Sequence, residues 1–227
     1  MFAKIYLSGN RGIHELPWFR SYHMFNFGSY QDEHRDAPGD LYVFNEDTLA
    51  AGRKFSLIAE ENSRVVLIPL VGAIACNNEL PIAGESLVVD AMAGETLCIS
   101  NPYENDDELV NFIQLWFKQP KLSAASSHVY PFSIDDPDKM NDVMNGTQTP
   151  LFSIGKYKGR GKGVYEKKEP SNALFVFVIE GVFEVEDRLL HTRDGLELNG
   201  FDAIEFEALS NNAIIMVTES DMTTGAN

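Results

Sequence analysis

The chain has 227 residues, of which 44% are hydrophobic, so it can form one large or two small domains with packed cores, and a disordered protein is excluded. Its formal charge of −16 at pH 7 argues against non-specific binding to nucleic acid and to anionic membrane surfaces. There are two cysteines, Cys76 and Cys98, and no apolar run long enough for a signal peptide or a membrane span. These features predict a cytoplasmic protein with two reduced, buried thiols.

The first half of the chain predicts short strands separated by turns. Apolar runs and alternating patterns predict strands over residues 2–7, 22–27, 41–45, 53–60, 64–71, 73–76, 85–89, 95–99 and 110–117. The pair Asn77-Asn78 predicts a hairpin turn. The acidic stretch 101–108 predicts a solvated loop.

A change of character over residues 121–150 predicts a boundary between two domains. Residues 123–127 resemble a linker. An acidic, proline-containing start predicts a short helix over Lys139–Met144, ended by Asn145 and Gly146. The boundary gives an N-terminal domain over 1–134 and a C-terminal domain over 135–227.

The second half predicts strands again, over residues 151–157, 174–179, 181–185, 196–198, 203–206 and 214–217. The apolar run 173–180 that ends at Gly181 repeats the form of the run from Val65 to Gly72, which indicates an internal duplication. The glycine-rich stretch 159–163 lacks the Ser/Thr and the helix of a P-loop, so it predicts a basic hairpin tip. The polar residues 219–227 are expected to fray.

An ordered set of motifs over residues 11–120 resembles the pirin family of two-barrel cupins. The spacing of Gly52 and Gly72 is that of the first cupin signature. The other segments that carry the resemblance are Arg11-Gly12, residues 18–30, residues 41–47, Ala93-Gly94, Gln114-Leu115-Trp116 and Pro120. The resemblance implies an all-β chain of two tandem antiparallel cupin (jelly-roll) β-barrels with little helix.

The resemblance also implies a metal site that this chain has lost. Pirin-like proteins usually bind one Fe, Ni, Cu or Mn ion in the N-terminal barrel through a His-x-His pair and a His-x-Glu pair. The matching positions here are Ile58 and Glu60, then Ile99 and Asn101, and Arg64 replaces the Glu of the first signature. The two isoleucines have no donor atom, and one carboxylate with one amide is a weak site for a transition metal. We therefore expect no metal and no other cofactor.

Two arrangements of the charged residues at this site are open. If Glu60 and Arg64 face the interior, Arg64 supplies the positive charge of the metal and binds Glu60 and the side-chain oxygen of Asn101, because a buried charge needs a partner. In the other arrangement both side chains reach solvent at the mouth of the barrel. The five histidines are scattered, and His23 is expected to be an ordinary strand histidine.

Three functions are compatible with these residues. The first is a non-catalytic protein that binds a small molecule in the N-terminal barrel. The second is a metal-dependent flavonol 2,3-dioxygenase (quercetinase), as in some pirin-like proteins, against which the lost ligands argue. The third is a regulatory protein that binds a protein partner of a transcription complex. Direct binding to nucleic acid or to a membrane is not expected.

Overall fold

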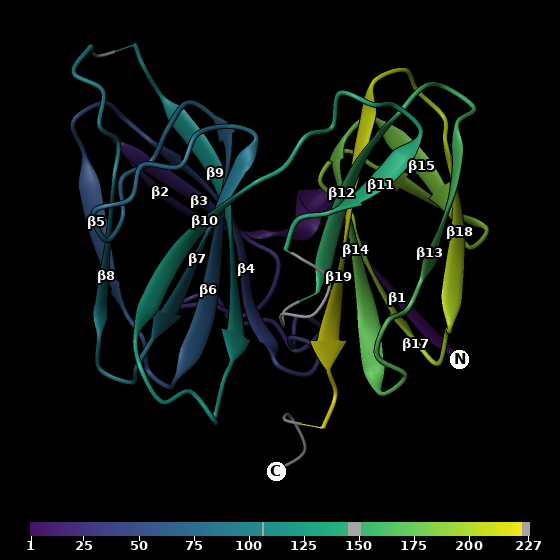
Figure 1. Ribbon diagram of the computed structural model, residues 1–227, viewed down its shortest axis with the longest axis horizontal. Helices are drawn as coiled ribbons and strands as arrows, with labels where there is room; N and C mark the ends of the chain where they lie inside the picture. The colour runs from purple at the N-terminus through teal and green to yellow at the C-terminus, as the bar shows by residue number, and fades with distance from the viewer. Residues whose placement is uncertain (106, 145–150, 224–227) are drawn as a thin grey trace. The chain divides into compact units, whose positions relative to one another are not determined.

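The computed structural model describes residues 1–105, 107–144 and 151–223, and the regular secondary structure of these residues is almost entirely β-strand (Figure 1). Within these ranges there is one short 3-10 helix, η1 (Ser8–Asn10), and no α-helix. The strands pair antiparallel throughout and divide into two compact units. The predicted all-β fold of two tandem cupin barrels is confirmed. No helix in the described part of the chain has the length and hydrophobicity needed to cross a membrane.

The first barrel is the unit Gly12–Pro131. Its seven-stranded sheet has the order β10-β7-β6-β9-β4-β3-β2, and β5 and β8 form a separate pair. The strands are β2 (Gly12–Leu16), β3 (Phe19–His23), β4 (Leu41–Leu49), β5 (Lys54–Ile58), β6 (Ser63–Val71), β7 (Glu85–Ala91), β8 (Thr96–Ser100), β9 (Val110–Lys118) and β10 (Ser126–Pro131). One face of each strand supplies the core, as the burial of Val65, Leu67 and Leu87 shows.

The second barrel is the unit formed by residues 1–11 and by the chain from residue 132 onward. Its six-stranded sheet has the order β1-β17-β14-β19-β12-β11, and its four-stranded sheet has the order β13-β18-β15-β16. The strands are β1 (Phe2–Tyr6), β11 (Lys139–Asp142), β12 (Phe152–Tyr157), β13 (Lys162–Glu166), β14 (Asn172–Glu180), β15 (Val182–Val185), β16 (Arg188–His191), β17 (Gly195–Asn199), β18 (Ala203–Ala208) and β19 (Ala213–Asp221). Its core includes Val176, Phe183, Leu196 and Ile215.

The predicted duplication is visible in matching elements of the two barrels. Strand β6 and strand β14 are both long, largely buried strands that end at a glycine. Gly72 has φ +77° and Gly181 has φ +82°, a conformation that residues with a Cβ rarely adopt. The predicted Asn77-Asn78 turn is also present: both residues have positive φ, and the Cys76 and Glu79 backbones bond to each other in both directions.

Strand pairing differs from the sequence predictions at four places. The predicted helix over 139–144 is wrong, because residues 139–142 form β11, which pairs with β12. The hydrogen bonds of this strand pairing outweigh the local preference for a helix. Asn145 and Gly146, the predicted end of the helix, lie outside the described residues. The predicted N-terminal domain 1–134 contains β1, which pairs with β17 of the second barrel (Figure 1). The linker-like residues lead into β10, and β19 continues to Asp221, so the predicted fraying does not begin at residue 219.

Candidate functional site

The positions predicted to replace the metal ligands are not brought together. Ile58 is 64% exposed and Glu60 is exposed, whereas Ile99 and Asn101 are buried. The cause is the two-residue period of β5, in which Lys54, Ser56 and Ile58 point outward. The inward positions are Phe55 and Leu57, and Ala59 is fully buried after them. These inward side chains carry no metal donor atom.

The side chain of Asn101 is fully used by the fold. Its Nδ2 donates to the carbonyl oxygens of Leu49 (2.9 Å) and Glu108 (2.8 Å), and its Oδ1 accepts from the backbone N–H of Tyr103 at 2.9 Å. The amide therefore ties the loop between β8 and β9 to the end of β4. It has neither the freedom nor the partners expected of a metal ligand. Within the described residues, no three His, Cys, Asp or Glu side chains gather closely enough to hold a metal ion.

Arg64 binds a different partner from the predicted one. Its Nε donates to Oδ1 of Asp90 at 2.6 Å and its Nη2 donates to Oδ2 at 2.8 Å, which is a bidentate ion pair between β6 and β7. The two residues lie opposite each other in the register of these strands. Of the two arrangements left open by the sequence, the one in which Arg64 binds Glu60 and Asn101 is corrected: the ion pair of Arg64 is with Asp90 on the neighbouring strand, and Glu60 is exposed.

Breaking this ion pair should destabilise the first barrel. The pair is mostly buried, with 19% of the Arg64 side chain and 11% of the Asp90 side chain exposed. We expect Arg64→Met to lower the free energy of unfolding by about 2 kcal/mol, because Asp90 is left uncompensated, and Asp90→Leu added to it to restore most of the loss. Denaturant midpoints of both single variants and the double variant measure this. The exposed Arg20–Glu15 pair is the matched control and should show little effect; additive losses at Arg64 and Asp90 would contradict the prediction.

The first barrel contains a cavity of about 360 Å³ that is enclosed mainly by aromatic and aliphatic side chains. Phe19 and Phe55 are in contact, with ring centroids 4.6 Å apart. The full lining consists of Ile13, His14, Leu16, Trp18, Phe19, Ser21, His23, Phe27, Gly28, Ser29, Tyr30, Phe55, Leu57 and Gln114. None of these side chains is Asp, Glu, Lys or Arg. A cavity of this size and character is typical of a small-molecule site.

A chain of polar side chains crosses the floor of this cavity. His23 is buried on β3, and its Nδ1 lies 2.9 Å from Oδ1 of Asn45 and 3.4 Å from Oγ of Ser21. Burial lowers the pKa of the His23 imidazole below its ordinary value of 6.5, with the hydrogen bond to Asn45 opposing the shift. The imidazole is therefore uncharged at neutral pH.

The same floor continues to a buried carboxyl group. Nε2 of Gln114 donates to Oδ2 of Asp47, and Oε1 of Gln114 accepts from Nε1 of Trp116 at 2.8 Å. Burial raises the pKa of Asp47 to about 7, with hydrogen bonds from Ser21 and Gln114 opposing the shift. Among the described residues, Oδ1 of Asp47 and Nδ2 of Asn45 are buried without a hydrogen-bond partner. Such groups are costly, and they occur together beside the cavity.

Sequence reasoning missed this polar floor, although a signal for it was present. Ser21 and His23 alternate with larger residues along β3, and Asn45 and Asp47 do so along β4. The apolar residues Val43 and Leu49 share the inward face of β4 with them. An alternating pattern that places polar residues on a core face indicates either a functional site or a strand whose sequence does not suit its buried position.

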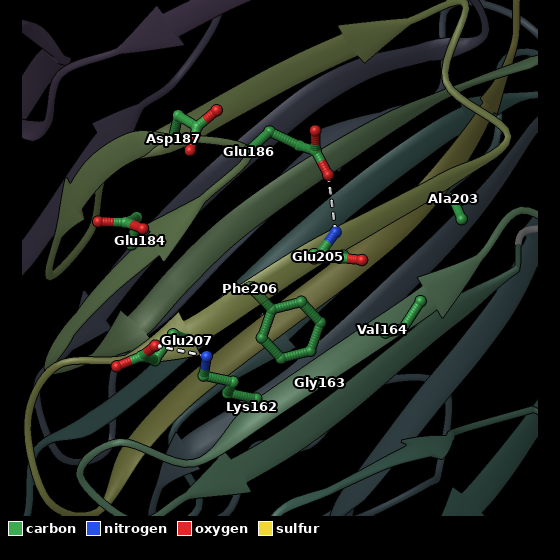
Figure 2. A pocket seen from close by; sticks show the side chains of 10 residues that line it. All are labelled: Lys162, Gly163, Val164, Glu184, Glu186, Asp187, Ala203, Glu205, Phe206 and Glu207. Atoms are coloured by element: carbon green, nitrogen blue, oxygen red, sulfur yellow. Dashed lines mark hydrogen bonds and ion pairs between the residues drawn. The ribbon is translucent and has the colours of Figure 1, made fainter.

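A second concavity, of about 670 Å³, lies on the outer face of the four-stranded sheet of the second barrel (Figure 2). Its rim is acidic, with Glu184, Glu186, Asp187, Glu205 and Glu207 around it. Figure 2 shows Lys162 reaching Glu207, at 3.4 Å, and Glu186 accepting from the backbone N–H of Glu205. The acidic rim of this surface disfavours anionic ligands.

Comparisons with known proteins agree with this architecture. Residues 136–218 match the family described as "Quercetinase C-terminal cupin domain". A quercetin 2,3-dioxygenase of Escherichia coli K12 is 22% identical, over 93% of this chain and 97% of that protein. A pirin-like protein of Caulobacter vibrioides is also 22% identical, over 88% of this chain and 92% of its own length. The crystal structure of the E. coli pirin YhhW with nickel(II) has a TM-score of 0.84 at 18% identity, over 97% of this chain and all of that chain.

The chain contains two antiparallel barrels, and each has a long buried strand followed by a glycine with positive φ, Gly72 in the first and Gly181 in the second. This architecture defines a two-barrel cupin. The relatives and the solved structure match over both barrels, and the family model matches within the second barrel. The chain is a two-barrel cupin that is similar to pirin-like proteins and to quercetin 2,3-dioxygenases.

Proposed function

We propose that this protein binds one small molecule in the cavity of the first barrel, without a metal ion. The observation that carries the proposal is the 360 Å³ cavity, with its aromatic walls and its polar floor. Pockets of this kind place a few polar groups in an apolar lining, where they orient a ligand. The polar floor is expensive to bury, which supports a role in binding rather than in packing alone.

The residues at the expected metal position do not fit a transition metal. Ile58 and Glu60 point away from Ile99 and Asn101, and the Asn101 amide is held by three hydrogen bonds. The His23 ring does not offer a substitute site, since Nδ1 is occupied by Asn45 and a single imidazole cannot hold a metal firmly. A non-catalytic binding protein is therefore our first proposal.

Metal analysis tests the metal-free part of the proposal. Protein purified without a chelator should contain well under one equivalent of iron, nickel, copper or manganese, because the donor atoms do not converge. The E. coli pirin that binds nickel(II), prepared in parallel, is the positive control. Stoichiometric metal that survives dialysis would contradict the proposal.

A flavonol 2,3-dioxygenase is the second candidate, favoured by the names of relatives such as the E. coli quercetin 2,3-dioxygenase. Aerobic incubation with quercetin separates the two candidates. We expect no oxygen uptake and no loss of the flavonol absorbance with this protein, whether or not nickel or iron is added. The E. coli enzyme serves as the control. Turnover that depends on added metal would favour the dioxygenase and reject the non-catalytic proposal.

A further inference from the structure

The outer face of the four-stranded sheet in the second barrel carries charges of both signs, and these are separated across the sheet. Lys162 on β13 is 77% exposed, and Arg160, in the turn that leads into β13, is 78% exposed. The next strands in the sheet, β18 and β15, present the exposed carboxylates Glu205 and Glu184. Figure 2 shows Lys162 and these acidic side chains around the same concavity. The face is therefore positive along β13 and negative along β18 and β15.

The negative side of this face is only partly neutralised within the chain. Glu207 on β18 takes both nearby cations, Arg160 at 2.8 Å and Lys162 at 3.4 Å. Among the described residues, the side chains of Glu184 and Glu205 have no ion-pair partner. Glu184 also lies directly opposite Glu207 in the register of β15 with β18, and like charges in that position destabilise a sheet. Further positive charge brought to this face would relieve the repulsion.

The positive side of the face is presented by a well-fixed turn. The backbone N–H of Arg160 donates to the carbonyl oxygen of Ala208 at 2.7 Å, and the N–H of Ala208 donates to that of Gly161 at 2.8 Å. The N–H of Gly159 donates to Oδ1 of Asn211 at 3.0 Å. Because the backbone is already ordered, the exposed cations of the turn can bind a partner with little loss of backbone entropy.

Exposed apolar side chains lie on the same face. Val164 is 57% exposed and lies opposite Glu205 in the register of β13 with β18. Leu189 is 53% exposed and lies opposite Glu184 in the register of β15 with β16. Residues directly opposite each other in an antiparallel pair project to the same side, so both apolar groups would be buried by a partner that covers the face.

We propose that this face binds the same face of a second copy of the chain, as a weak two-fold dimer. In a contact around a two-fold axis, each surface meets an identical surface turned by half a turn. The positive side of one copy then lies over the negative side of the other, so that Arg160 and Lys162 meet Glu184 and Glu205 in two equivalent places. Charge complementarity fixes this register, and the proposed small-molecule function does not depend on it.

The large negative charge of the chain is compatible with such a dimer at physiological salt. Two copies with a formal charge of −16 each repel one another over long distances. At about 0.15 M salt the Debye length is about 8 Å, which screens this repulsion and leaves much of the attraction between charges in direct contact.

Sedimentation of the whole chain at this salt concentration tests the dimer. The weight-average mass should rise reversibly with concentration, from that of the monomer near 1 µM toward twice that value at a few hundred µM, as mass action requires for a dissociation constant of about 50 µM. A monomer at every concentration up to about 500 µM would overturn the proposal.

Charge reversal locates the contact. An acidic variant, with Arg160→Glu and Lys162→Glu, has one sign of charge over the whole face, and a basic variant, with Glu184→Lys and Glu205→Lys, has mostly the other. Each variant alone should dimerise at least about 100-fold more weakly than the wild type, because like charges now meet across the axis. An equimolar mixture of the two should form a heterodimer at the concentrations at which the wild type dimerises. Two variants that stay monomeric when mixed would overturn the proposal.

A matched control separates the position of the charges from their number. Arg53→Glu with Lys54→Glu changes the net charge as much as the acidic variant does, at exposed positions of the first barrel, and should dimerise like the wild type. If the control also becomes monomeric, net charge is the cause and the proposal fails. If the acidic variant does not fold, the basic variant carries the test, since it leaves the turn at Arg160 unchanged; a wild-type dimer that survives in the basic variant would show that the contact lies elsewhere.

Discussion

Glu219→Ala should cause one of the largest losses of stability in the chain, about 4 kcal/mol, because this buried carboxylate organises one end of the second barrel. Its Oε1 accepts from the Tyr165 hydroxyl at 3.0 Å and from the backbone N–H of Lys168 at 2.7 Å. Its Oε2 accepts from the backbone N–H of Glu169 at 3.1 Å and from Nδ2 of Asn172 at 3.0 Å. Removing the side chain leaves four donors without an acceptor, and hydrogen bonds to a charged group typically contribute about 1.5–3 kcal/mol each without being additive.

The loss of stability in Glu219→Ala should be measured separately for each barrel. Both tryptophans, Trp18 and Trp116, lie in the first barrel, so their fluorescence does not report directly on the second. Hydrogen exchange followed by mass spectrometry should show faster exchange in β12, β14 and β19. Glu184→Ala, at an exposed position of the same barrel, is the control and should change exchange little. Protection in Glu219→Ala equal to that of the control would contradict the role of this carboxylate.

The sequence was sufficient for the architecture because the fold depends on patterns that are local and repeated. The apolar run that ends at Gly72 and the one that ends at Gly181 both became long core strands followed by a turn with positive φ. Each feature is decided within about ten residues of chain. The helix predicted over 139–144 failed for the opposite reason: its acidic, proline-containing start is a local signal, and the pairing of β11 with β12 is a contact between segments that local signals do not describe.

Two of the predicted site positions, Ile58 and Glu60, are exposed, whereas Ile99 and Asn101 are buried. A shift of one position moves a side chain to the other face, so Ile58 and Glu60 were expected where Leu57 and Ala59 lie. The alternation of Lys54, Phe55, Ser56 and Leu57 carried the correct phase. The glycine spacing of the motif does not carry this alternation, and the apolar side chain of Ile58 is compatible with either face.

The polar floor of the cavity could not be assembled from the sequence, because its members come from three strands. Ser21 and His23 lie on β3, Asn45 and Asp47 on β4, and Gln114 on β9. Strand β3 was itself predicted three residues too late, over 22–27 instead of Phe19–His23, which hid the inward phase of Ser21 and His23. Only the register of β3 with β4, and of β4 with β9, makes these side chains neighbours.

Asp47→Asn should raise the stability of the protein at pH 8 and leave it nearly unchanged at pH 4. Burial raises the pKa of the Asp47 carboxyl from its ordinary 3.8 to about 7 in the folded protein. Between these two values the folded state binds more protons than the unfolded state, so this group makes stability fall as the pH rises from about 4 to about 7. One pH unit of pKa corresponds to about 1.4 kcal/mol, so the whole rise corresponds to about 4 kcal/mol, all of it present above pH 7. An asparagine can still accept from Nε2 of Gln114 and carries no ionisable proton, so the variant should be free of this cost.

Urea unfolding from pH 4 to pH 8, followed by the fluorescence of Trp18 and Trp116, measures the difference between variant and wild type, in which the titration of all other groups cancels. Asp107→Asn, at an exposed position of the same barrel, is the matched control and should follow the wild type at every pH. Parallel stability curves for Asp47→Asn and wild type would show that Asp47 ionises in the folded protein without the cost of burial.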